Sequence, residues 1–196
     1  MSPGRVLVAE LGKAVALRVA LGLGWRRLRE RPFRALKPAQ DRRERLSRKQ
    51  VLPAILLYRE LLARLSPERA LEVTGRVIHA GAVAHLKKTL GRVDANELAA
   101  LPADVRRAKV EAWIDRFFTA TAEIDEVSAH EVRFTVHACA LVRLTRDVGH
   151  PELGSAFCTG DKAFFENQTP PIVFTRPQTL ASGGTSCPFT LTLRDG

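Results

Sequence analysis

The feature that most constrains the fold is a change in the spacing of apolar residues near residue 131. Before it, apolar residues recur every three or four positions, whereas in "EVRFTVHACALVRL" (131–144) they alternate with polar ones, as in a half-buried strand. Two further strands are predicted in "PIVFTR" (171–176) and "PFTLTLR" (188–194). This order predicts an α+β fold, with N-terminal helices packed on a small antiparallel sheet formed by the C-terminal half.

Helix signals divide the rest of the chain. One helix is expected from Ser47 to Leu65, and the Ser-Pro-Glu sequence after it predicts a second helix that ends at Gly91. A third is expected over residues 104–124. Beyond the first strand, residues 152–168 are predicted to form two short helical pieces, broken at Thr159-Gly160.

The positive charge is concentrated at the N-terminus. Residues 1–50 contain 14 Lys and Arg against 4 Asp and Glu, so the net charge of +10 lies entirely in this part. We therefore predict a basic amphipathic segment over residues 1–46 and an α+β domain over residues 47–196. Peripheral contact of residues 1–45 with an anionic membrane is one interpretation, and a helix packed on the domain and followed by a solvated linker is the other.

Other partner classes have little support. The basic segment offers only Trp25 and Phe33 for stacking on bases, so no nucleic acid is predicted. Glu10, Lys13 and Arg18 interrupt its apolar stretch, which argues against a membrane span. No phosphate-binding loop or dinucleotide fingerprint occurs, and no cofactor is predicted.

Three cysteines, an odd number without a secretory signal, predict reduced thiols and a cytoplasmic protein. Cys158 is the strongest candidate nucleophile, because it lies at the expected helix break and close to Asp161. His137 and Cys139 are expected on one face of the first strand. Small buried thiols are the alternative reading. A zinc site made by the three thiols and His137 lacks closely paired ligands, so no metal is predicted.

The long connection between the last two strands is rich in hydrogen-bond donors. Arg176 suits a carboxylate, while Thr179 and the backbone of Gly183-Gly184 could stabilise an anion. Cys187 ends this connection. A simple turn beside a solvated arginine is the alternative.

These residues carry a resemblance to a known family. The blocks "FTVHACALVRL", "GHPELGSAFCTGDKAFF" and "IVFTRPQTLASGGTSCPFTL" resemble, in order and spacing, the L-2-amino-thiazoline-4-carboxylic acid hydrolase family. The resemblance covers about Val132 to Leu193, and the helices from about Ser47 are compatible with the family's helical half. The resemblance implies that residues 47–196 form a hydrolase-like α+β domain.

The resemblance implies hydrolytic opening of a cyclic amidine-like C=N bond in a small-molecule substrate, giving an N-carbamoyl amino acid. It suggests the following roles: Cys158, His137, Asp161 and Cys187 catalytic; Arg176, Thr179, Gly183, Gly184 and Cys139 substrate-binding. Two other classes stay open, a non-catalytic relative that binds a small molecule and a membrane-surface accessory protein.

Overall fold

The computed structural model describes residues 1–193. The described residues form two compact units: a helical unit made of residues 1–82 and 141–160, and a sheet unit made of residues 83–140 and 161–193. Arg194, the last residue of the strand expected over residues 188–194, lies outside the described part. The predicted boundary between residues 46 and 47 stays a prediction.

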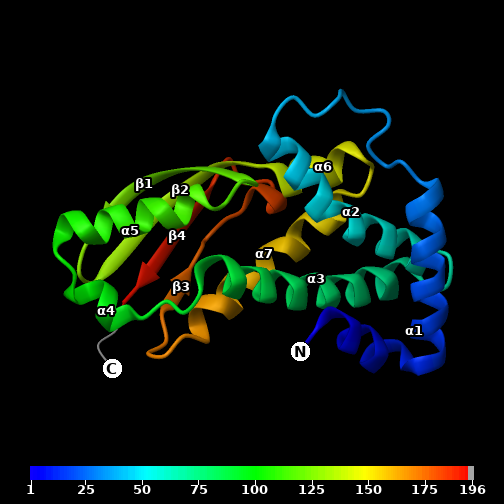
Figure 1. Cartoon of the computed structure of the whole chain (residues 1–196), viewed down its shortest axis with the longest axis horizontal. Helices are drawn as coiled ribbons and strands as arrows, with labels where there is room; N and C mark the ends of the chain where they lie inside the picture. Colours follow the sequence, from blue (N-terminus) through cyan, green and yellow to red (C-terminus); the bar gives the residue numbers. More distant parts are fainter. Residues whose placement is uncertain (194–196) are drawn as a thin grey trace. The chain divides into compact units, whose positions relative to one another are not determined.

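The helical unit contains the N-terminal helices and a return segment (Figure 1). Its elements are α1 (Pro3–Arg29), α2 (Arg42–Leu62), most of α3 (Pro67–Leu90), α6 (Ala140–Asp147), a short 3-10 turn (Pro151–Leu153) and the first half of α7 (Gly154–Glu166). The predicted bounds of α3 are confirmed, because Gly91 follows its last residue with φ of 72°. Asp41 caps α2 by accepting a hydrogen bond from the Glu44 N–H, so this helix begins five residues before the expected Ser47.

An ion-pair cluster fixes α1 on α2. The Arg26 Nε donates to the Glu60 carboxylate at 2.5 Å, and the Arg64 guanidinium lies 2.6 Å from the other oxygen of Glu60. Glu60 is almost fully buried, and a Cβ atom at Gly22 would overlap its carboxylate. A side chain at position 22 would therefore have to displace the Glu60 carboxylate from its two arginines.

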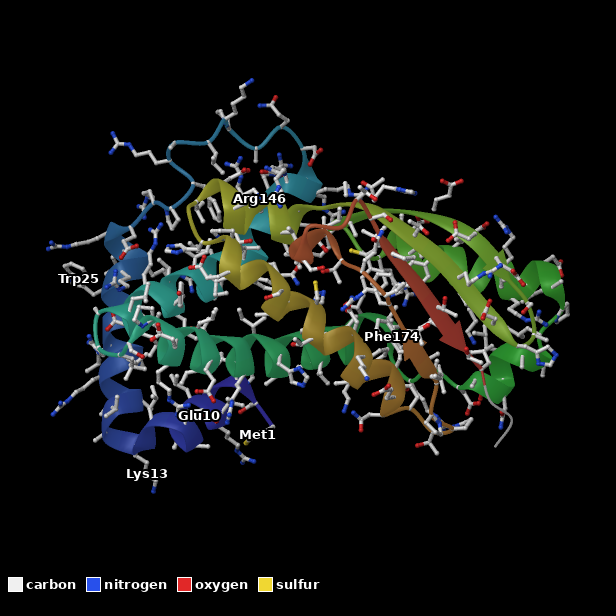
Figure 2. All side chains as sticks on the ribbon, turned by 180° about the vertical axis from the view of Figure 1, so that it is seen from behind. Met1, Glu10, Lys13, Trp25, Arg146 and Phe174 are labelled. Carbon is white, nitrogen blue, oxygen red and sulfur yellow. The ribbon has the colours of Figure 1, made fainter. Side chains whose placement is uncertain are left out.

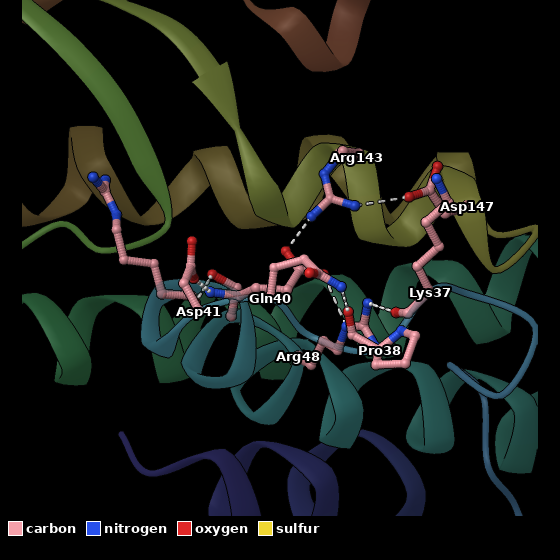
Figure 3. A network of polar contacts seen from close by, with 10 residues as sticks. Lys37, Pro38, Gln40, Asp41, Arg48, Arg143 and Asp147 are labelled. Atoms are coloured by element: carbon pink, nitrogen blue, oxygen red, sulfur yellow. Dashed lines mark hydrogen bonds and ion pairs between the residues drawn. The ribbon is translucent and has the colours of Figure 1, made fainter.

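The segment between α1 and α2 is tied down by polar contacts (Figure 3). The Arg48 Nη2 donates to the Lys37 carbonyl at 2.7 Å, and its Nε donates to Glu44 at 2.8 Å. Arg143 of α6 joins the same cluster by pairing with Glu44 and with Asp147. This basic segment is thus tied to α2 through Arg48, and α2 is tied to α6 through Arg143, so the segment is not a purely solvated linker.

The sheet unit confirms the α+β prediction. Its four described strands are antiparallel in the order β1-β2-β4-β3 (Figure 1). Their bounds are β1 (Ala120–Val127), β2 (Glu131–Cys139), β3 (Val173–Thr175) and β4 (Cys187–Thr192), and the helices α4 (Ala95–Ala100) and α5 (Ala103–Asp115) precede them. Apolar residues of α4, α5, the end of α3 and the second half of α7 pack with one face of the sheet to form the core.

Three local predictions are wrong. The expected helix over residues 104–124 ends at Asp115, and β1 follows it, since Ala122 and Ile124 face the core and Glu123 faces solvent in the two-residue period of a strand. The strand expected over residues 131–144 ends at Cys139, where α6 begins and buries Val142 and Thr145, which are three residues apart.

The third correction concerns α7, which is continuous through Thr159-Gly160. The Thr159 hydroxyl donates to the Ala156 carbonyl at 2.9 Å, inside the helix. A glycine costs a helix only about 1 kcal/mol, and burial of Phe164 and Phe165 outweighs that cost.

None of the helices in residues 1–193 combines the length and the apolar character that crossing a membrane requires.

We predict that Gly22→Ala lowers the free energy of unfolding by about 1–3 kcal/mol, because the added methyl group must displace the buried Glu60 carboxylate from its two arginines. Gly24→Ala is the matched control, since nothing lies within 4 Å of its Cβ position in the same helix. We expect the control to gain up to about 1 kcal/mol from helix propensity. Urea unfolding measures both, and equal stability of the two variants would contradict this packing.

Candidate active site

A β-bulge decides which residues of β2 face the core. Val136 pairs with Ala122, but Ala138 pairs with Thr121, so His137 is an extra residue without a partner position on β1. An extra residue reverses the alternation of faces beyond it. Cys139 pairs with Ala120, which packs against the core as Ala122 does, so Cys139 lies on the same face as Val136.

His137 lies on the outer face of the sheet. Its side chain is 52% exposed, and its Nε2 is 3.6 Å from a carboxylate oxygen of the exposed Glu123. The expectation that His137 and Cys139 share a face is therefore wrong, because it assumed an unbroken strand register. The proposed catalytic role of His137 itself stays a prediction.

The inner face carries an arginine in an aromatic setting. The guanidinium carbon of Arg176 lies 5.3 Å from the centre of the Phe174 ring and 5.0 Å from that of Phe189. Such contacts are favourable because aromatic ring faces attract cations. Phe189 in turn stacks on Phe134 at 4.6 Å, so the arginine rests on the aromatic part of the core; Figure 2 labels Phe174 at this place.

Asp161 of α7 completes this arrangement. Its carboxylate accepts a hydrogen bond from Arg176 Nη1 at 2.6 Å, and the Arg176 side chain is only 10% exposed. The spacing of residues along α7 and along the strand explains this contact. Phe165 lies one helical turn after Asp161, and Phe174 lies two residues before Arg176. Because the Phe165 and Phe174 rings stack, Asp161 and Arg176 also meet. Helix α7 thereby positions Asp161, and strand β3 positions Arg176.

Burial makes the Arg176–Asp161 pair different from an ion pair on the protein surface. Burial of the carboxyl group raises the pKa of Asp161 above its ordinary value, and the guanidinium of Arg176 offsets only part of this effect. A carboxyl group with a raised pKa holds a proton more readily near neutral pH. Asp161 can therefore serve in proton transfer as well as in charge pairing.

The three thiols lie in different settings. Cys187 is buried beside Val136, its pairing partner on β2, and its sulfur accepts a hydrogen bond from the Leu180 N–H at 3.2 Å. Cys139 is half-buried on the same inner face. Cys158 is half-buried on α7, three residues before Asp161 and thus on the same side of that helix, with its Sγ donating to the Gly154 carbonyl at 3.8 Å.

The connection between β3 and β4 is held together by its own donors. The Thr179 hydroxyl accepts from the Ser182 N–H at 3.0 Å, and the Gly184 N–H donates to the Thr179 carbonyl at 2.9 Å. Gly183 has φ of 89°, a conformation that favours glycine. The structure thus gives Thr179 and Gly184 a role in shaping the loop, and their proposed role as donors to an anion stays a prediction.

Phe174 and Phe189 were missed as site residues by sequence analysis. Both lie in the two strands predicted over residues 171–176 and 188–194, and neither was given a role in the site. The available signal was the two-residue spacing from Phe174 to Arg176 and from Cys187 to Phe189, which places all four residues on one face. Within residues 1–193, no group of three or more His, Cys, Asp and Glu residues is placed to hold a metal ion.

The fold and this charged pair define an α+β protein with an arginine–carboxylate pair on the aromatic inner face of a small antiparallel sheet. The family model for L-2-amino-thiazoline-4-carboxylic acid hydrolase matches residues 44–191, about three quarters of the chain. The chain belongs to this family of hydrolases, which act on carbon–nitrogen bonds. Searches of the curated proteins and of the solved structures find no match.

We predict that Arg176→Gln raises the pKa of Asp161 further, because both effects that lower it come from Arg176. A raised pKa stabilises the folded protein below the pKa of the unfolded chain, and this contribution is lost as pH rises through the folded-state value. The variant should thus lose about 2 kcal/mol of stability at neutral pH and less at acidic pH.

Urea unfolding at a series of pH values tests this, together with carbon NMR of the Asp161 carboxyl group. Arg107→Gln, which removes a guanidinium from an exposed ion pair, is the control and should change little at any pH. A loss of stability in Arg176→Gln that is the same at every pH would contradict the assigned coupling.

Proposed function

We propose that this protein hydrolyses 2-amino-thiazoline-4-carboxylate, or a closely related cyclic amidine carboxylate, by opening its ring. Family membership supports the reaction class, and the matched residues 44–191 include Asp161 and Arg176. The observation that carries the proposal is the Arg176 guanidinium, which is nearly buried on two phenylalanine rings and paired with the Asp161 carboxylate. This is a suitable site for the carboxylate of a small planar ring.

Arg176 is proposed to bind the substrate carboxylate. A guanidinium presents its N–H donors in one plane, and this geometry suits a carboxylate. Low solvent exposure strengthens the electrostatic attraction relative to a surface site. Phe189, which is only half-buried, offers an apolar surface to the ring of the substrate.

Asp161 is proposed to interact with the amidine nitrogens. A substrate carboxylate bound nearby adds negative charge and raises the pKa of Asp161 further. The carboxyl group can then supply the proton that the ring nitrogen takes up when a nucleophile adds to the neighbouring carbon.

Cys158 is proposed as the nucleophile, on the same side of α7 as Asp161. Its thiolate adds to the ring carbon between sulfur and nitrogen, and the C=N bond becomes a protonated single bond. The ring carbon–sulfur bond then breaks, the leaving sulfur takes a proton, and water replaces the enzyme sulfur to leave an N-carbamoyl amino acid. Water as the direct nucleophile gives the same product, and the thiols are then structural.

The remaining residues have supporting proposed roles. Cys187 and Cys139 are proposed to line the inner face around the substrate, and Thr179, Gly183 and Gly184 to shape the loop and donate hydrogen bonds to the tetrahedral intermediate. His137 is proposed as acid or base, and replacing it by Gln tests this role through the pH dependence of kcat. The reaction does not depend on His137 if turnover and its pH profile are unchanged.

We predict that Cys158→Ser lowers kcat at least about a thousandfold, because a hydroxyl is a far weaker nucleophile than a thiolate. The melting temperature should change by less than about 2 °C, since the substitution is nearly isosteric. Ser155→Ala, an exposed position on the same helix, is the control and should retain full turnover. Retained turnover in Cys158→Ser would show that water attacks directly.

We predict that Arg176→Lys lowers kcat/KM about 10-fold to 100-fold, mainly through KM. Lysine keeps the charge but loses the planar fork that suits a carboxylate. Arg107→Lys, exposed on α5, is the matched control. An unchanged KM in Arg176→Lys would remove Arg176 from carboxylate binding, whatever the identity of the nucleophile.

A further inference from the structure

Helix α1 exposes a row of large apolar side chains. Leu17, Leu21, Trp25 and Leu28 are 63%, 68%, 55% and 77% exposed, and we call them the α1 stripe. At 3.6 residues per turn they lie on one side of the helix. Figure 2 shows the Trp25 side chain pointing away from the ribbon. We propose that the α1 stripe docks the protein on an anionic phospholipid surface.

The opposite side of α1 is the one that packs on the protein. Its buried residues beyond Gly12 are the small Ala16 and Val19, Gly22 lies against Glu60, and Arg26 pairs with Glu60. A helix that only packed on its own domain would bury its large apolar residues and expose its small ones. Here the packed side contains Ala16, Val19 and the half-buried Leu23, while four large apolar side chains are exposed, so the stripe is available to an outside apolar phase.

The rotation of α1 about its axis is fixed by charged contacts. Arg26 pairs with Glu30 as well as with Glu60, and Arg59 of α2 lies 3.1 Å from Glu30. The Glu10–Arg69 pair lies before Gly12, whose non-helical backbone separates it from the part of α1 that carries the stripe. Turning the stripe inward would break the pairs made by Arg26 and Glu30, and the exposed face is therefore a stable feature of the helical unit.

The charges around the stripe complement lipid phosphates. The segment over residues 13–29 has five basic residues and no acidic one. On the helix, Lys13 and Arg27 border one edge of the stripe, and Arg18 and Arg29 border the other. Basic side chains beside an apolar helix face are typical of helices that lie in the membrane interface, where the cations meet anionic headgroups.

Trp25 strengthens the case for lipid. Tryptophan is enriched at membrane interfaces, because its ring is apolar while its N–H bonds to headgroups or water. The guanidinium carbon of Arg29 lies 4.7 Å from the centre of the Trp25 ring, so a cation and an aromatic ring are presented together. A second copy of this chain fits less well, since two such basic helices would repel each other.

The full-length protein can be tested by co-sedimentation with vesicles. We expect binding to vesicles that contain phosphatidylglycerol in phosphatidylcholine, and at least about tenfold weaker binding to phosphatidylcholine alone. Leu21→Asp should weaken binding to the anionic vesicles about tenfold or more. Val105→Asp is the matched control, because Val105 is also apolar and exposed but lies on α5.

The charge contribution is tested by Arg18→Gln with Arg27→Gln, which should weaken binding about 10-fold to 30-fold. Arg107→Gln with Lys109→Gln on α5 is the control with the same change of charge. Vesicle addition should shift the fluorescence of Trp25, and Trp25→Phe should remove the shift, since the other tryptophan, Trp113, is buried.

Equal binding to neutral and anionic vesicles, no binding to either, or equal loss in the stripe and control variants would overturn the proposal. So would a dimer without lipid that Leu21→Asp converts to a monomer, because the stripe would then join two copies. These outcomes are independent of ring-opening activity in solution.

Discussion

The candidate site depends on how one guanidinium is buried. A nearly buried arginine is stable only when its charge is compensated, and Arg176 has the Asp161 carboxylate at 2.6 Å and the faces of Phe174 and Phe189. Asp161 has a raised pKa, since burial exceeds the effect of its partner. We propose that a substrate carboxylate binds here as well, because low solvent exposure strengthens its attraction to the guanidinium.

Burial of this pair requires a definite register between one helix and two strands. Phe165 on Phe174 sets the position of α7 along β3, and Phe189 on Phe134 joins β4 to β2. The continuous helix α7 then carries Asp161 to the arginine, with Cys158 one turn earlier on the same side.

Much of the fold follows from the sequence. The α+β order, the bounds of α3 and the two C-terminal strands were predictable, because caps, glycine stops and two-residue alternation are local signals. The β-bulge at His137 was not, since a register shift is defined by pairing with β1 and leaves no local mark. β1 itself was read as helix because Trp113 and Phe117 have helical spacing immediately before it. Residue types alone were enough to single out Arg176, Asp161 and the thiols as candidates. Which face of the sheet the strand residues lie on could be known only from the pairing of the strands.

The charge asymmetry of the chain also has a structural counterpart. Basic residues of α1 border an exposed apolar stripe, whereas Arg26 is used internally to hold the helix on α2. Arginine thus holds α1 on α2 from one side of the helix, and we propose that arginines on the other side contact lipid headgroups.

The central claim is that Arg176 selects a substrate by its carboxylate. It is tested most directly by comparing kcat/KM of the wild-type protein for 2-amino-thiazoline-4-carboxylate and for 2-amino-thiazoline, which has the same ring without the carboxylate. The account predicts that removal of the carboxylate lowers kcat/KM at least about a hundredfold, because a buried arginine is then left with one partner fewer. Equal values for the two compounds would contradict it.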